Sequence, residues 1–227
     1  MRSARSADGG PVNDQQLLTA LTTEHFTLQG ARAQTMSESS ARASLYIVSV
    51  SSTLVALGFI TQLSEIGDIF NVFALTVLPT IYLLGAVTFV RMVECSAEDF
   101  RYGLAINRIR AYYKEIAGDR ANLFLLSAHD DPPGVLSTTA LPTEGRIPYF
   151  AFSTAIAVIN SVVGGAAVAV ALGALADASL GVAVVAGGAA ALFSAAAWIR
   201  WADRTFDARA SEIEPLFPSQ PEVHDTD

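Results

Sequence analysis

The decisive stretch runs from Asp68 to Val90 and reads DIFNVFALTVLPTIYLLGAVTFV, with no charged residue after Asp68. An α-helix of about 20 apolar residues crosses the hydrocarbon core of a bilayer, so this stretch is long enough to span a membrane. Arg91 ends the charge-free run, and neither a glycine pair nor a proline interrupts the sequence from there to Gly118. We therefore expect one continuous helix of about 50 residues, about 75 Å long, whose second half projects into water.

The second half of this helix carries apolar residues on one face. They recur at alternating spacings of four and three and are Tyr102, Ile106, Ile109, Tyr113 and Ile116. This face, which we call the stalk seam, needs a partner, because an isolated helix end in water is marginally stable. Two partners fit: the helix expected at residues 14–41, packed antiparallel as a cytoplasmic helical stalk, or the same helix of a second copy.

Three further apolar runs predict membrane spans at residues 43–63, 149–176 and 181–199, beside the span at 68–90. The whole chain is 52% hydrophobic and only 16% charged, with a mean hydropathy of +0.40. Short connections follow the first and third spans, and short connections join antiparallel neighbours. The sequence therefore predicts an all-α membrane protein with four transmembrane helices in two antiparallel hairpins.

The remaining segments complete the domain organisation. Residues 1–12 and the acidic residues 211–227 have the composition of disordered tails. The N-terminal helix starts after Asn13, with Gln16 at capping-box spacing, so that residues 13–118 hold this helix, the first hairpin and its cytosolic extension at 91–118. Residues 119–147 form a cytoplasmic linker, irregular over 129–143, and residues 148–210 hold the second hairpin. The apolar run 123–126 either lies on the membrane surface or covers the stalk.

The distribution of basic residues predicts the topology. Four Lys and Arg residues precede the first span, seven lie between Arg91 and Arg146, and three follow from Arg200 onward. The two short connections carry only the acidic residues Glu65, Asp68 and Asp177. The positive-inside rule then places both termini and the central region in the cytoplasm of a cell whose inner (plasma) membrane holds the spans.

Two sets of polar residues lie within the spans. Ser44, Ser51 and Gly58 repeat every seven residues in the first span, and Gln62 follows one turn later. This set is either a close packing seam or a water-facing stripe. The second set, Asn160 and Ser161 in the middle of the third span, either makes interhelical hydrogen bonds or lines a solute path.

Pro79 lies inside the second span. A proline removes one backbone hydrogen bond and kinks a helix. The kink is either a tolerated feature of a membrane helix or a gating hinge.

No motif for catalysis, cofactor binding or metal binding is present. The sequence lacks a nucleophile elbow, a phosphate loop and a zinc helix, and its three histidines, His25, His129 and His224, are far apart. His25 on the first helix is either a packing residue or a pH switch, and Cys95 is either a small packing residue or an acylation site. The net charge of −8 argues against a nucleic-acid partner. We expect no enzyme activity, no cofactor and no metal.

One segment carries a resemblance. The sequence YGLAINRIRAYYKEIAG at 102–118, with the polar N-terminal helix and the first hairpin, resembles a group of actinobacterial four-span membrane proteins that have no assigned activity. The similarity covers Glu24 to Gly118 best. In architecture alone the chain also resembles two-span effector modules with a long cytosolic helix, which are thought to form pores in bacterial defence systems.

Two functions follow from these observations. The first is an oligomeric channel or pore, indicated by the serine-rich first span, Pro79 and the unpartnered stalk seam. The alternative is a non-catalytic scaffold or accessory subunit that offers its stalk and tails to a cytosolic protein. The expected partners are the lipid bilayer and further copies of the chain.

Overall fold

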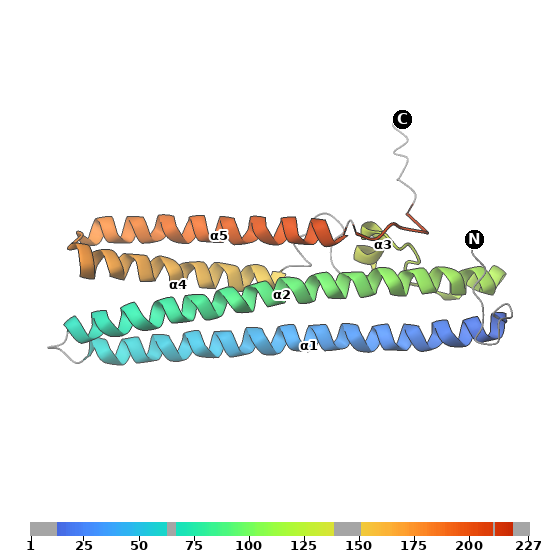
Figure 1. The fold of residues 1–227 in the computed structure, drawn as a ribbon, viewed down its shortest axis with the longest axis horizontal. Coiled ribbons are helices and arrows are strands. Elements are labelled where there is room, and N and C mark those ends of the chain that lie inside the picture. The colour runs from blue at the N-terminus through green and yellow to red at the C-terminus, as the bar shows by residue number, and fades with distance from the viewer. Residues whose placement is uncertain (1–12, 63–66, 139–150, 211, 220–227) are drawn as a thin grey trace, which may run out of the picture. The chain divides into compact units, whose positions relative to one another are not determined.

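The computed structural model describes residues 13–62, 67–138, 151–210 and 212–219. Over these ranges the regular elements are all helical: α1 (Asp14–Thr61), α2 (Gly67–Ala117), the 3-10 helix η1 (Gly118–Leu123), α3 (Pro132–Ser137), α4 (Ala151–Ala176) and α5 (Leu180–Ala210) (Figure 1). Four of the described helices, α1, α2, α4 and α5, are long and apolar enough to cross a membrane. The predicted all-α class and the four membrane-length helices are confirmed.

The chain divides into two compact units. Among the described residues, the four-helix unit comprises 36–62, 67–97, 151–210 and 212, and it holds the apolar parts of the four long helices. The loop-bearing unit comprises 13–35, 98–138 and 213–219, and it holds the first part of α1, the last part of α2, η1, α3 and a C-terminal segment. The long helices α1 and α2 therefore each contribute to both units.

Helix α1 begins with the predicted capping box. The Gln15 backbone N–H donates to Oδ1 of Asn13 over 3.2 Å, and the Asn13 N–H donates to Oε1 of Gln16 over 3.4 Å. These two bonds satisfy amides that the first turn of a helix leaves without partners. The helix then continues without a break into its apolar part, through the small and polar residues 32–40 in which the sequence periodicity fades.

Helix α2 is continuous over 51 residues and contains Pro79. It ends where the sequence predicts, because Gly118 has φ +52°, a left-handed conformation that favours glycine and ends helices. Pro79 itself is exposed on the outer side of the four-helix unit. Whether the proline bends the helix stays a prediction.

Two local predictions need correction. A short helix, α3, occupies part of the segment 129–143 that the sequence predicts to be irregular. It forms because Asp131 caps it, accepting from the Gly134 N–H over 2.8 Å, and because Pro132 and Pro133 fit a first helical turn, where no N–H is needed. The second correction concerns residues 213–219, which lie in the predicted disordered tail but belong to the loop-bearing unit, where Phe217 and Ser219 donate to Asp130 and Asp131. Other predictions fall on 1–12, 63–66, 139–150, 211 and 220–227, outside the described residues.

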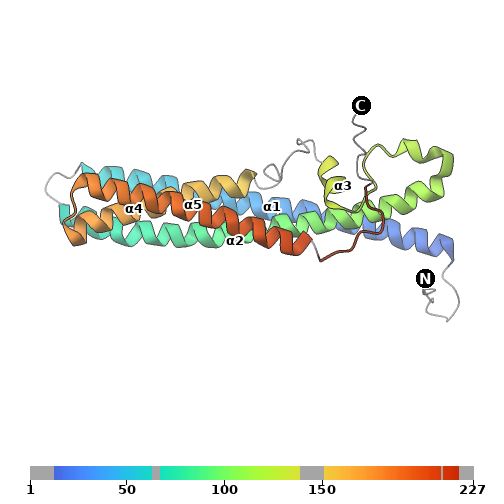
Figure 2. The ribbon, with the colours of Figure 1, turned by 90° about the horizontal axis from the view of Figure 1, so that it is seen from above.

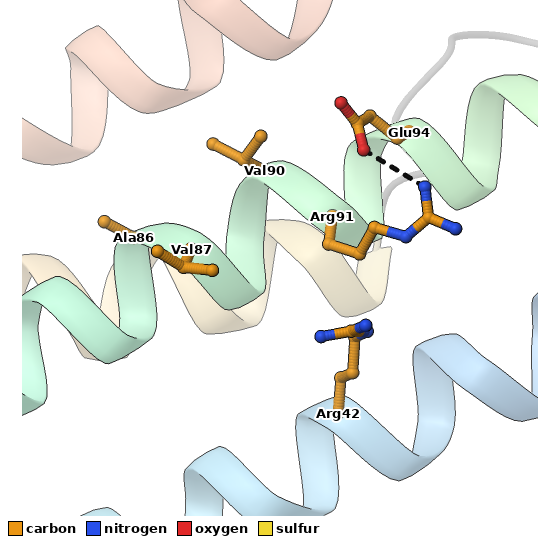
Figure 3. Close-up of a pocket in the computed structure, with 6 residues that line it drawn as sticks. All are labelled: Arg42, Ala86, Val87, Val90, Arg91 and Glu94. Carbon is orange, nitrogen blue, oxygen red and sulfur yellow. Dashed lines mark hydrogen bonds and ion pairs between the residues drawn. The ribbon is translucent and has the colours of Figure 1, made fainter.

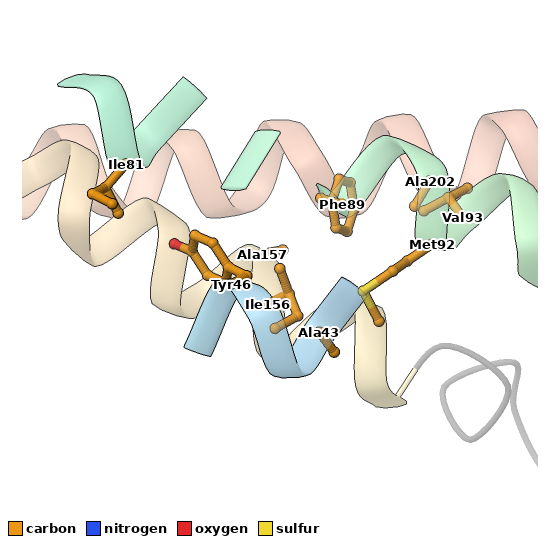
Figure 4. Packing of buried hydrophobic residues seen from close by; sticks show 9 residues of the cluster. All are labelled: Ala43, Tyr46, Ile81, Phe89, Met92, Val93, Ile156, Ala157 and Ala202. Carbon is orange, nitrogen blue, oxygen red and sulfur yellow. The ribbon is translucent and has the colours of Figure 1, made fainter. Parts of the chain in front are cut away.

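The core of the four-helix unit is built by all four long helices. It contains Ala43 and Tyr46 from α1, Phe89, Met92 and Val93 from α2, Ile156 and Ala157 from α4, and Ala202 from α5 (Figure 4). Helices α4 and α5 lie side by side along their length (Figures 1 and 2). In the most apolar window of each helix, 33% of the residues are buried in α2 and α4, but only 11% in α1 and α5. Helices α2 and α4 are therefore the inner pair, and α1 and α5 present most of their apolar surface outward.

Candidate functional site

The polar residues predicted in the third span lie at the centre of the four-helix unit. Asn160 and Ser161 on α4 are 0% and 1% exposed. Burying an amide or a hydroxyl costs free energy unless it finds a hydrogen-bond partner. Their partners are Tyr46 of α1 and Ser194 of α5, and Ser194 also contacts Tyr82 of α2; we call these five residues the buried polar network.

Asn160 connects α4 to α1. The Tyr46 hydroxyl donates to Oδ1 of Asn160 over 3.0 Å, and both side chains are fully buried. Gly85 on α2 makes room for this pair, because a Cβ at that position would lie 2.1 Å from Oδ1 of Asn160 and 2.7 Å from the Tyr46 ring. The Nδ2 group of Asn160 has no hydrogen-bond partner among the described residues. The network is thus satisfied on one side of the amide and open on the other.

Ser161 connects α4 to α5 and, through α5, to α2. Its hydroxyl donates to Oγ of Ser194 over 3.1 Å, and the Tyr82 hydroxyl lies 3.0 Å from the same Ser194 oxygen. Gly164, one turn after Ser161, lets the Tyr82 ring approach, since a Cβ there would lie 2.7 Å from the ring. Hydrogen bonds of this network therefore connect α1 with α4, α4 with α5, and α5 with α2.

Small residues set how closely α4 and α5 approach. A Cβ on Gly165 would lie 2.4 Å from the backbone oxygen of Gly187, and a Cβ on Gly187 would lie 2.6 Å from that of Gly165. Backbones come this close only where both helices lack a side chain, as small-residue motifs in membrane helices allow. The glycines of the third and fourth spans thus fix the spacing at which Ser161 reaches Ser194.

The polar set with seven-residue spacing in the first span, which we call the seam on α1, lies away from the buried polar network. Ser44, Ser51, Gly58 and Gln62 are exposed on the outer side of α1, and a Cβ on Gly58 would meet nothing within 4 Å. The Ser44 hydroxyl donates to the Ser40 carbonyl oxygen of its own helix over 2.9 Å. Within this chain the seam packs against no other described helix, and it does not join the buried network.

Four charged residues form a cluster where the apolar part of α1 begins and the apolar part of α2 ends. The Arg91 guanidinium donates to both carboxylate oxygens of Glu38, over 2.8 and 3.2 Å, and to Oε2 of Glu94 over 3.2 Å. Arg42 donates through Nε to Oε1 of Glu38 over 2.9 Å. The hydrogen bonds from Arg91 and Arg42 lower the pKa of Glu38 to about 2. The carboxylate shared between the two arginines therefore stays ionised at physiological pH.

A shallow groove of about 430 Å³ opens beside this cluster. Its apolar wall is formed by Ala86, Val87 and Val90 of α2, and its polar edge by Arg42, Arg91 and Glu94 (Figure 3). Figure 3 shows the Arg42 side chain pointing from α1 toward α2. The groove is amphipathic, with cationic and anionic groups at one end and aliphatic side chains at the other.

In the loop-bearing unit, the middle of the stalk seam is buried and its end is exposed. Ile106 and Ile109 are buried, Tyr102 and Tyr113 are half-buried, and Ile116 is 54% exposed. The Tyr113 hydroxyl donates to Oγ1 of Thr22 over 3.4 Å. Arg32 forms a bidentate pair with the buried Asp99, over 2.8 and 2.9 Å. The first part of α1 therefore contacts the last part of α2 within the loop-bearing unit.

His25 also lies against this face. Its ring centroid is 5.8 Å from that of Tyr113, and its Nε2 lies 2.9 Å from Nε2 of Gln29. Burial, and secondarily the charge of Arg110, lower the pKa of His25. A lowered pKa favours the neutral imidazole, which suits a packing residue.

Two adjacent carboxylates hold the C-terminal segment. Asp130 is buried and accepts from the backbone N–H groups of Leu216 and Phe217, over 3.0 and 2.7 Å, while Arg108 pairs with it over 2.5 Å. Asp131 accepts from the backbone N–H and the hydroxyl of Ser219, both over 2.5 Å. We call Asp130, Asp131 and the segment 213–219 the C-terminal clasp.

The electrostatics of the clasp favour the ionised carboxylates. Burial alone would raise the pKa of Asp130, but the bonds from Leu216, Phe217 and Arg108 outweigh burial and lower it. The pKa of Asp131 is lowered in the same way, against burial, by the bonds from Ser219 and Gly134.

Sequence reasoning found part of this site. It identified Asn160 and Ser161, but it missed their partners Tyr46, Tyr82 and Ser194. The available signal was the presence of tyrosines inside charge-free runs, since a buried tyrosine hydroxyl usually needs a partner. It also missed the clasp, for which the acidic pair before two prolines was the only sign.

In the part of the chain that the structure describes, no three His, Cys, Asp or Glu side chains are grouped so that they could hold a metal ion, and Cys95 is buried. Comparison of the chain with protein-family models, with curated proteins and with solved structures finds no match.

Proposed function

We propose that this protein is a multi-pass integral membrane protein of the plasma membrane that works without catalysis, as a homo-oligomeric channel or pore. Its four membrane-length helices are compatible with a multi-pass protein. In this proposal they form two antiparallel hairpins, and the loop-bearing unit and both termini lie in the cytoplasm, where the positive-inside rule places their basic residues.

The observation that supports an oligomer is the outward position of the seam on α1. Ser44, Ser51 and Gly58 are exposed, lie one above another at seven-residue spacing, and belong to a helix whose apolar window is only 11% buried. Small residues at such spacing let a second helix approach closely. A second copy of the chain would bury this face and give α1 the packing that it lacks within one chain.

The position of the polar groups favours a path between copies over a path within one chain. The buried polar network is used for hydrogen bonds between helices, and Tyr46, Asn160 and Ser161 are buried. The outward-facing hydroxyls of Ser44, Ser51 and Ser52 instead form a mildly polar surface on α1. In an assembly around a common axis, the part of this surface that the neighbouring copy leaves uncovered would line that axis with hydroxyl groups.

The test combines the mass of the assembly with its conductance. Native mass spectrometry from lipid nanodiscs should give a homo-oligomer for the wild type and smaller species for Ser51→Phe, which places a large ring on the seam. Val185→Phe on the outer side of α5, where Val185 is 73% exposed, is the control and should leave the assembly unchanged. A monomeric wild type would remove the oligomer from the proposal.

Ion and solute flux through liposomes containing the purified protein then separates a pore from a scaffold. We expect flux for the wild type and for Val185→Phe, and reduced flux for Ser51→Phe. An intact oligomer with no flux under any voltage or solute tested would contradict the pore and leave the scaffold.

One observation favours the second candidate function, a membrane scaffold that binds a cytosolic protein. The loop-bearing unit exposes a run of large apolar side chains after α2: Leu123 is 78% exposed and Leu125 is 95% exposed. Exposed apolar patches of this kind mark interaction surfaces. Photocrosslinking from position 125 in cells should then yield a defined adduct with a second protein, and crosslinks to lipid alone would instead place the run on the membrane surface.

A further inference from the structure

The groove at the charged cluster has chemical features that the buried polar network lacks. Val87, in its apolar wall, is 65% exposed, so the wall faces outward from the four-helix unit. The volume of the groove, about 430 Å³, is within the range of small-molecule sites, about 300–1,000 Å³. Each arginine borders a charge-free run: Arg42 directly precedes residues 43–61 of α1, and Arg91 directly follows residues 69–90 of α2.

The donors at this edge are unevenly used. Arg91 binds Glu38 and Glu94, but Arg42 binds Glu38 through Nε alone. The two terminal nitrogens of Arg42 therefore have no acceptor among the described residues. An arginine fork binds phosphate oxygens with charge-assisted hydrogen bonds, which are stronger than neutral ones.

One acceptor at the edge is also open. Glu94 uses Oε2 for the bond from Arg91, and its Oε1 accepts from no described residue. Its side chain is 43% exposed. A cationic ligand group with N–H donors would find an acceptor there.

The charges of the cluster sum to zero, since Arg42 and Arg91 balance Glu38 and Glu94. A neutral cluster with one open cationic donor and one open anionic acceptor complements a zwitterion. An anionic headgroup would gain the contact with Arg42 but would lie beside the charge of Glu94, and like charges at close range repel.

We propose that this groove binds a zwitterionic phospholipid with a primary amine headgroup, whose phosphate accepts hydrogen bonds from Arg42, whose ammonium donates to Glu94, and whose acyl chain lies along Ala86, Val87 and Val90. The site rests on the proposed function in one respect, that the apolar parts of α1 and α2 lie in a bilayer. The lipid is then bound at the boundary between hydrocarbon and water. Its headgroup lies at the level of the two arginines.

Lipid selectivity measured by native mass spectrometry tests the site. Purified protein is exchanged into mixed micelles containing phosphatidylethanolamine, phosphatidylcholine or phosphatidylglycerol of the same chain length, and bound lipid is counted. The wild type should retain phosphatidylethanolamine best, because the choline headgroup has no N–H donor and the glycerol headgroup leaves a net negative charge. Equal retention of the three lipids by the wild type would overturn the proposal.

Variants assign the two contacts. Arg42→Gln should lower retention of phosphatidylethanolamine about tenfold, the effect of losing one charge-assisted hydrogen bond. Glu94→Gln should remove the preference for phosphatidylethanolamine over phosphatidylcholine while the phosphate contact remains. Arg200→Gln is the matched control, because Arg200 is an exposed arginine just after the apolar part of α5 and lines no part of this groove. If Arg42→Gln and Arg200→Gln behave alike, the assignment of the phosphate to Arg42 is wrong.

Val87→Trp covers the case in which a charge substitution disturbs folding. It fills the apolar wall without altering a charge and should also lower lipid retention, with helicity by circular dichroism unchanged. Carbonate extraction of cell membranes separates the two proposals. Wild-type protein released into the soluble fraction contradicts membrane insertion, whereas protein that stays in the membrane but shows no headgroup preference contradicts only the lipid site.

Discussion

At the scale of single residues, the positions without a side chain decide how the polar groups meet. Gly85 is the clearest case, because it is the place where α2 leaves room for Asn160 and Tyr46. Asn160 is short and fully buried, so it has little freedom to move away from an added methyl group. The consequences of a substitution therefore differ sharply between this glycine and an outward-facing one.

We expect Gly85→Ala to lower the thermal stability of the purified protein in detergent by several degrees, because the new methyl group separates Tyr46 from Asn160. Overpacking of a core typically costs about 1–3 kcal/mol. Gly188→Ala on the outer side of α5 is the matched control, since a Cβ there meets nothing within 4 Å and the position lies outside the proposed seam on α1. Nearly equal melting temperatures for the two variants would contradict the close contact at Gly85.

The hydrogen bond between Tyr46 and Asn160 makes a second prediction at this scale. A double-mutant cycle with Tyr46→Phe and Asn160→Ala should give a coupling free energy of about 0.6 kcal/mol, the average for interhelical hydrogen bonds in membranes, and at most about 1.7 kcal/mol. Unfolding in mixed detergent measures it. The pair Tyr46→Phe and Ser194→Ala should be additive, because no hydrogen bond joins these residues directly.

At the scale of elements, the C-terminal clasp shows how buried carboxylates hold a segment that lies outside the helices. Its order comes from charge-assisted hydrogen bonds, since two buried carboxylates accept from the backbone of Leu216, Phe217 and Ser219. Such bonds depend on the ionised form of the acceptor. The attachment of residues 213–219 should therefore vary with pH.

The clasp should open in acid. The pKa values of Asp130 and Asp131 are lower in the folded state than in the unfolded chain. The two carboxylates therefore contribute fully to the stability of the clasp above the unfolded pKa of about 3.9. This stabilisation is lost as the pH falls through the lower folded pKa values. Hydrogen-exchange protection of the Leu216 and Phe217 amides, corrected for intrinsic rates, should be constant from pH 8 to 5 and fall below about pH 4.

A substitution separates this effect from general acid unfolding. At pH 7, Asp130→Asn should lower protection of the two amides about tenfold, as expected when a hydrogen bond loses its charge. Asp119→Asn in η1, where Asp119 is exposed, should leave protection unchanged. Protection that is insensitive to Asp130 would mean that the segment is held by other contacts.

At the scale of the whole molecule, the four apolar helices and the basic residues make one joint prediction about topology. Reporter fusions at either terminus should be active on the cytoplasmic side, and a cysteine placed at Glu65 in the first connection should react with an impermeant thiol reagent in intact cells. The native Cys95 is buried, so its background labelling should be low. A terminus found outside the cell, or a position 65 that is labelled only after lysis, would contradict the arrangement.

The sequence by itself determined the features that depend on local composition and periodicity. Charge-free runs predict the four membrane-length helices, Asn13 and Gln16 predict the start of α1, and Gly118 predicts the end of α2, because solvation, capping and backbone sterics each act within a few residues. The sequence also identified Asn160 and Ser161, since polar side chains stand out in an apolar run.

Only the tertiary structure decided which residues meet. The hydroxyls of Tyr46 and Tyr82 reach Asn160 and Ser194 across more than a hundred residues of sequence, and Asp130 captures Leu216 and Phe217 from a tail that looks disordered by composition. The physical reason is that a buried polar group is stable only with a partner, and the identity of that partner depends on how distant helices pack. Local sequence can indicate that a partner is needed, but only the packed chain supplies it.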